Sequence, residues 1–105
     1  MTNKPVMLDP YVIDTLMGDL VGHDRKPAAY IVYLALWRLG GTSGEAAISL
    51  QGLATATGLS KSAVQRSITH LVRRGLLFIQ RRAATDIPRY RCLSPWQRQA
   101  DAGPD

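Results

Sequence analysis

Apolar residues recur at helical spacing in the first part of the chain. The pattern begins at Asp9-Pro10, an N-cap residue followed by proline at the first helical position. Gly22 follows the last apolar position and predicts the end of the helix. The spacing therefore predicts a helix over residues 9–21, whose apolar stripe comprises Ile13, Leu16, Met17, Leu20 and Val21.

A second helical stretch, residues 27–39, is apolar around most of its circumference. It starts at Pro27 and is closed by Gly40-Gly41. A helix without a polar face has to be surrounded by other elements. We expect this helix to be the centre of the domain.

Residues 49–59 predict a short helix and a tight turn. Ser49 is a good N-cap, because its hydroxyl can accept a free backbone N–H of the first turn. Gly58 can adopt the left-handed conformation that reverses the chain, and Leu59 can fill the angle between two helices. Small Ala54 allows those helices to cross closely.

The next helix is expected over residues 61–74, with Ser60 as its N-cap, and it has two distinct faces. The core-facing stripe comprises Val64, Ile68, Leu71 and Val72. The opposite face carries Ser62, Arg66, Thr69 and Arg73, flanked by Gln65 and His70. No carboxylate occurs between Glu45 and Asp86 in the sequence, so the charge on this exposed face has one sign.

Two strands are expected after Gly75, which ends the helix. Residues 76–80 have strand composition, and residues 89–93 alternate with period two. Residues 81–88 would connect them as a hairpin, with Pro88 at the start of an edge strand, where no ladder N–H is lost. Residues 47–48 are expected to form a short strand against this hairpin.

These elements in this order describe a winged helix-turn-helix. The predicted fold class is mainly α with a small β-hairpin: helix, helix, short strand, helix, helix and β-wing. With 105 residues and a hydrophobic content of 46%, the chain suits a single core. We expect an N-terminal arm at residues 1–8, the domain at 9–93 and a flexible tail at 94–105. Such a module lays the second helix of the turn in the major groove of DNA.

A resemblance to known families supports the same fold. The stretch TATGLSKSAVQRSITHLVRRGLLFI, residues 55–79, resembles the helix-turn-helix and first wing strand of MarR-like and GntR-like bacterial regulators. It is also similar to the winged-helix domains of phage and plasmid replication proteins. The wing departs from these families, since its tip lacks the glycine often found there. The resemblance implies that arginines of the wing contact the DNA backbone and that six residues face the DNA: Ser60, Lys61, Ser62, Gln65, Arg66 and Thr69.

The distribution of charge also indicates a polyanionic partner. The net charge is +5, but residues 1–60 carry four basic and five acidic side chains, and residues 61–105 carry nine basic and three acidic ones. Clustered basic charge of this kind suits DNA phosphates. We expect Gln65 to contact adenine and Arg66 to contact guanine. Phosphate contacts are expected from Lys61, Arg73, Arg81, Arg82, Arg89 and Arg91.

The sequence lacks the residues that other chemistries need. No His–carboxylate pair is placed to activate Ser60, Ser62 or Ser67, and no phosphate loop or metal-ligand spacing is present. We therefore expect no enzymatic activity, no metal and no cofactor. The lone Cys92 cannot form an internal disulfide and is expected to pack as a small hydrophobic residue.

The two histidines are expected to have minor roles. His70 has no cysteine or carboxylate nearby in the sequence and lies on the polar flank of its helix. It is expected to contact a phosphate or nothing. His23 stands beside Asp24 between two helices, where we expect it to cap a helix or to face solvent.

The sequence also predicts a cytoplasmic location. The longest apolar run, residues 30–37, is far shorter than the ~20 residues of a membrane span. No apolar signal-peptide core follows Met1-Thr2-Asn3-Lys4.

The leading functional hypothesis is a small transcriptional regulator that binds specific sequences in double-stranded DNA. Two alternatives stay open: a winged-helix module that binds protein through its apolar first helix, and a DNA-binding protein of replication or plasmid maintenance. A lone winged helix reads few base pairs, and the first helix has more apolar surface than one seam requires. We therefore expect a homodimer through residues 9–21.

Overall fold

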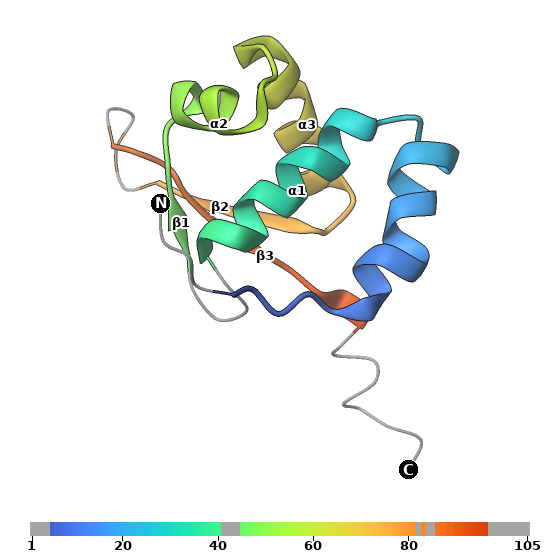
Figure 1. Cartoon of the computed structure of the whole chain (residues 1–105). Coiled ribbons are helices and arrows are strands. Elements are labelled where there is room, and N and C mark those ends of the chain that lie inside the picture. Colours follow the sequence, from blue (N-terminus) through green and yellow to red (C-terminus); the bar gives the residue numbers. More distant parts are fainter. Residues whose placement is uncertain (1–4, 41–44, 82, 84–85, 97–105) are drawn as a thin grey trace.

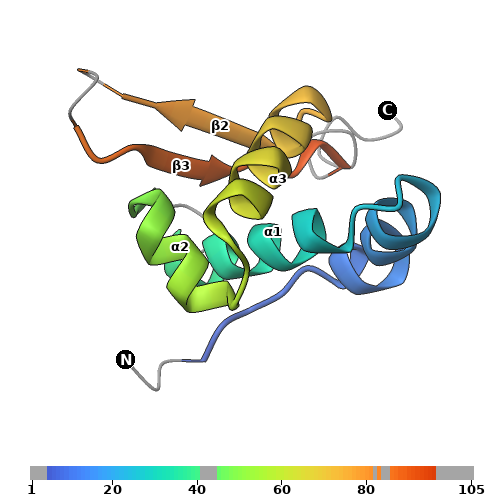
Figure 2. The same cartoon turned by 90° about the horizontal axis from the view of Figure 1, so that it is seen from above.

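The computed structural model describes residues 5–40, 45–81, 83 and 86–96. In these ranges the elements are η1 (Val12–Leu16), η2 (Gly18–His23), α1 (Pro27–Gly40), β1 (Ala46–Ala47), α2 (Leu50–Thr57), α3 (Lys61–Arg73), β2 (Leu77–Gln80) and β3 (Arg89–Cys92). Helices lie on one face of a small antiparallel sheet, and the β2–β3 hairpin extends away from them (Figures 1 and 2). The predicted winged helix-turn-helix fold is confirmed.

The first helix is longer than predicted and differs in its hydrogen bonding. Asp9 is the cap that its sequence position indicates, because its Oδ1 accepts the backbone N–H of Tyr11 at 2.9 Å. The helical run then passes through Gly22 to His23, with the i→i+5 bonding of a π-helix in both η1 and η2. The prediction that Gly22 ends this helix was wrong. Glycine permits a chain reversal but does not impose one.

The reversal occurs instead at Arg25, which has a left-handed φ of 57°. The next backbone N–H, that of Lys26, donates to Leu20 O at 2.7 Å and closes the end of the helix. Left-handed backbone brings the Cβ of an ordinary residue too close to its carbonyl oxygen, at a cost of about 1–2 kcal/mol. Arg25 therefore occupies a position that suits glycine.

We expect Arg25→Gly to raise the free energy of unfolding by up to about 1 kcal/mol, since part of the relief is offset by the greater backbone entropy of glycine when unfolded. Urea denaturation measures this change. Lys26→Gly is the matched control, because Lys26 has no positive φ, and it should lower stability. A loss of stability in both variants would contradict the assignment of strain to Arg25.

The helix-turn-helix has the caps and turn that its sequence predicts. Ser49 Oγ accepts the N–H of Gly52 at 3.0 Å, and Ser60 Oγ accepts the N–H of Ala63 at 3.1 Å. Gly58 has a left-handed φ of 79° and donates its N–H to Ala54 O at 2.9 Å. In Figure 2, α2 and α3 cross at a steep angle on either side of this turn. These local contacts fix the direction in which α3 leaves the turn.

The buried face of α3 differs from the prediction at one position. Val64, Ile68 and Leu71 are buried as expected, but Val72 is 42% exposed, and its assignment to the core was wrong. Ser67, only 4% exposed, takes its place beside the stripe. Its hydroxyl donates to Ala63 O at 2.8 Å, so a polar residue is buried without losing a hydrogen bond.

Helix α1 is the centre of the core, as predicted. Its three large aromatic side chains also tie the helix to distant segments. The Tyr30 hydroxyl donates to Val12 O, the Tyr33 hydroxyl to Leu93 O and the Trp37 indole N–H to Met7 O, each at 2.9 Å. Burial raises the pKa of both tyrosine hydroxyls, so they remain neutral donors.

The sheet has the strand order β1-β3-β2, with both neighbouring pairs antiparallel. The short strand β1 begins one residue earlier than predicted, and it pairs Ala46 with Tyr90 and Ala47 with Arg89. Ile48 still contacts the hairpin through its N–H, which donates to Pro88 O at 3.3 Å.

The segment after β3 is packed where the sequence predicted a flexible tail from residue 94. The Trp96 ring stacks on Tyr11 with centroids 4.4 Å apart, and its indole N–H donates to Asp9 Oδ2 at 3.0 Å. Residues 94–96 therefore belong to the folded domain. Residues 97–105 lie outside the described residues.

Candidate nucleic-acid interface

The four polar residues that helical spacing placed on the outward face of α3 are all exposed there: Ser62, Arg66, Thr69 and Arg73. Since the core residues occupy the other side of the helix, the polar side chains are left in solvent. No ion pair with another described residue forms at Lys61, Arg66 or Arg73. The exposed set is Ser60, Lys61, Ser62, Gln65, Arg66, Thr69 and Arg73. This face offers free positive charge together with donors and acceptors suited to base edges.

The N-terminal turn of α3 has a serine that is already engaged. Ser60 Oγ serves as the cap and lies 3.4 Å from Ser62 Oγ. Ser62 is exposed just beyond the cap. Ser62 is therefore the freer of the two hydroxyls, and the main role of Ser60 is to begin the helix.

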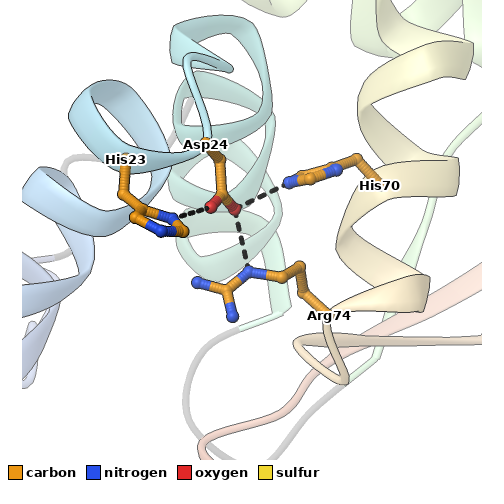
Figure 3. Close-up of polar contacts among 4 residues, drawn as sticks. All are labelled: His23, Asp24, His70 and Arg74. Atoms are coloured by element: carbon orange, nitrogen blue, oxygen red, sulfur yellow. Dashed lines mark hydrogen bonds and ion pairs between the residues drawn. The ribbon is translucent and has the colours of Figure 1, made fainter.

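The C-terminal end of α3 is held by the carboxylate of Asp24, a half-buried residue whose contacts the sequence did not predict (Figure 3). Asp24 Oδ2 lies 2.8 Å from His70 Nε2 and accepts the Nε–H of Arg74 at 2.8 Å. Its other oxygen lies 2.9 Å from His23 Nδ1. The expectation that His70 lacks a carboxylate partner was wrong. Its partner comes from the loop after η2, and no local sequence signal joins these positions.

The electrostatics of this cluster favour the charged carboxylate. The Asp24 side chain is only 8% exposed. The hydrogen bond with His23, followed by those with His70 and Arg74, holds the pKa of Asp24 well below its ordinary value of 3.8, although burial acts in the opposite direction. A charged Asp24 thus fastens the end of α3 to the loop between η2 and α1.

The wing carries the predicted arginines, but two of them face a carboxylate. Arg81, Arg89 and Arg91 are exposed, and Arg82 lies outside the described residues. Glu45, just before β1, has its two carboxylate oxygens 3.9 Å from Arg89 and 3.8 Å from Arg91. The positive charge of the outer wing is therefore partly balanced. Local sequence patterns could not predict this pairing, because Glu45 is remote from the hairpin along the chain.

A hollow of about 500 Å³ lies against the hairpin. Arg81 and Arg89 line it together with Glu45 and Asp86. Charges of both signs face this hollow, so it does not select for an anion in the way that the α3 face does.

One remaining candidate group among the described residues is Cys92, which is partly buried against the core. Burial raises the pKa of the Cys92 thiol to about 12, so the thiolate that reacts with oxidants or metals is scarce. Among the described residues, no group of three or more His, Cys, Asp or Glu side chains is arranged so that it could hold a metal ion. No helix in those ranges is long and apolar enough to cross a membrane.

The fold and the exposed basic face of α3 define a winged helix-turn-helix protein. Residues 26–77 match the family model described as a helix-turn-helix domain. This match runs from Lys26, the residue before α1, to the first residue of β2. It supports a DNA-binding family of the helix-turn-helix class and does not separate MarR-like or GntR-like regulators from replication proteins. No match was found among curated proteins.

Proposed function

We propose that the protein is a small transcriptional regulator that binds specific sequences in double-stranded DNA through α3. The observation that carries the proposal is the exposed face of α3, where Gln65 and Arg66 lie among basic side chains that form no ion pair with other described residues. A face of this composition is complementary to the major groove and to the phosphates beside it.

Each exposed side chain of the face has a role that follows from its chemistry. The Gln65 amide can bond the N6 and N7 edge of adenine, and the Arg66 guanidinium can bond O6 and N7 of guanine. Lys61 and Arg73, at the two ends of α3, are assigned to phosphates. Ser62 and Thr69 provide hydroxyls that can bond either a base or a phosphate.

Selection of bound sequences from a random duplex pool tests the sequence specificity. We expect enrichment of a short motif, and we expect Gln65→Ala to relax the preference at one adenine of that motif. If the protein binds duplex DNA but enriches no motif, the proposed sequence specificity is contradicted, and DNA binding without sequence preference remains.

The open alternatives differ from this proposal in their partners. A replication or plasmid-maintenance protein would use the same face on DNA, and its enriched sites would lie at a replication origin rather than before genes. A protein-binding module would instead use the apolar side of the first helix. Ile13, Met17 and Val21 are spaced four apart there and are all exposed, at 46%, 38% and 39%.

We assign this exposed stripe to a homodimer contact, since symmetric dimers allow two copies of α3 to read two half-sites. Sedimentation at micromolar concentration is expected to give twice the chain mass of 11.5 kDa. Met17→Glu should yield a monomer, because it would bury a charge in the contact. Thr15→Glu is the control, since Thr15 is exposed on η1 outside the stripe, and it should remain a dimer. A wild-type monomer that binds single half-sites would contradict the dimer.

A further inference from the structure

The outer face of the β1-β3-β2 sheet is the face turned away from the core. The register of the strands determines which charged side chains lie next to one another on it. Ala46 and Tyr90 are paired and buried, so their neighbours along each strand point to the opposite, outer face. Continuing the same antiparallel register places Glu45 opposite Arg91 and diagonal to Arg89. One carboxylate is thus built in between two arginines.

The geometry of these two ion pairs suits a weak and reversible interaction. Glu45 Oε1 lies 3.9 Å from Arg89 Nη1, and Oε2 lies 3.8 Å from Arg91 Nη2. These distances exceed those of direct hydrogen bonds. Both arginine side chains are more than half exposed, whereas Glu45 is 29% exposed. Ion pairs of this kind add little to folding stability. Because both arginine side chains are exposed, their guanidinium groups remain accessible to an external anion.

We propose that Glu45 competes with DNA phosphates for Arg89 and Arg91 and thereby limits how tightly the wing binds duplex DNA of any sequence. The inference rests on the proposed binding of duplex DNA. Carboxylate and phosphate oxygens use the same guanidinium donors, and the fixed negative charge also repels a phosphate that approaches the pair. Weak backbone binding by the wing leaves discrimination to the α3 face, since phosphate contacts carry no direct sequence information.

The proposal is tested by measuring how tightly Glu45→Gln binds a random-sequence duplex. Fluorescence anisotropy monitors this binding over a series of salt concentrations. We expect about fivefold tighter binding at low salt, the effect of one unit charge at about 4 Å in a water-like medium. The advantage over the wild type should shrink as salt increases, and the salt dependence should steepen by about 0.9 for each additional phosphate that the wing neutralises. The thermal unfolding midpoint should stay within about one degree of the wild type, because the pairs are solvent-exposed.

Asp14→Asn is the matched control, because it removes one exposed carboxylate on η1 and changes the net charge equally. It should bind DNA like the wild type. A second control is the double variant Arg89→Ala and Arg91→Ala. Adding Glu45→Gln to this double variant should not make it bind DNA more tightly.

The outcomes separate the two proposals. Equal binding by Glu45→Gln and Asp14→Asn, with the wild type bound to DNA, would overturn the competition and leave the proposed function in place. A fivefold increase in affinity that persists without the two arginines would overturn it as well. Absence of duplex binding by the wild type and by both single variants at every salt concentration would instead contradict the proposed function itself.

Discussion

Replacing Gln65 and Arg66 together with alanine is expected to remove sequence-specific DNA binding and leave the fold intact. Both side chains are exposed on α3, and neither belongs to the hydrophobic core. A good bidentate base contact contributes about 1–3 kcal/mol of discrimination. The double variant should therefore lose roughly one to four powers of ten in affinity for a selected site.

Fluorescence anisotropy on the selected site measures the loss, and circular dichroism checks the fold. Arg66→Lys is an informative companion, because it retains the charge and loses the planar fork that bonds guanine in two places. It should bind random duplex nearly as well as the wild type and lose preference at one guanine. The regulator hypothesis would be contradicted if the wild type does not bind DNA and the double variant still binds the same cellular partner as the wild type. That result would favour the protein-binding alternative.

Asp24→Ala is expected to lower the free energy of unfolding at neutral pH by about 2–3 kcal/mol. It would leave His70 and Arg74, which both contact Asp24 at 2.8 Å, without their acceptor. Hydrogen bonds to charged groups contribute about 1.5–3 kcal/mol. Because these bonds fasten the end of α3, the variant should also bind DNA less tightly than the wild type.

The pH dependence of that loss follows from the lowered pKa of Asp24. Its pKa is below 3.8 in the folded protein and ordinary in the unfolded chain, so the stabilisation is fully present above about pH 4 and is lost as pH falls toward the folded pKa. Urea denaturation at neutral pH and at about pH 3 should show the difference between wild type and Asp24→Ala shrinking with acid. Asp14→Ala, on the exposed side of η1, is the control and should change stability little. An equal loss at both pH values would assign the effect to packing rather than to charge.

Local signals in the sequence were sufficient to predict the helix-turn-helix and its polar face. Ser49, Gly58 and Ser60 act through backbone groups three or four residues away, so their roles are readable from adjacent letters. The outward face of α3 follows from helical periodicity alone. Val72 shows the limit of that reasoning, because a small polar residue, Ser67, occupies the edge of the buried arc instead.

The features that the sequence could not predict all depend on contacts between distant segments. Asp24 meets His70 only after η2 and α3 have packed around α1. Glu45 meets Arg91 only through the β1–β3 register. Trp96 likewise stacks on Tyr11 from the other end of the chain. In each case the chemistry of the residue is ordinary, and its partner is set by the fold.

Titration of a duplex oligonucleotide over a series of salt concentrations tests the central claim most directly, that the exposed basic face of α3 binds DNA. The logarithm of the association constant should fall linearly with the logarithm of salt concentration, with a slope of about −0.9 for each phosphate neutralised. Each of the single variants Lys61→Ala and Arg73→Ala should make the slope shallower by about 0.9, because each removes one phosphate contact. Absence of duplex binding at low salt, or binding indifferent to salt and to both substitutions, would contradict the claim.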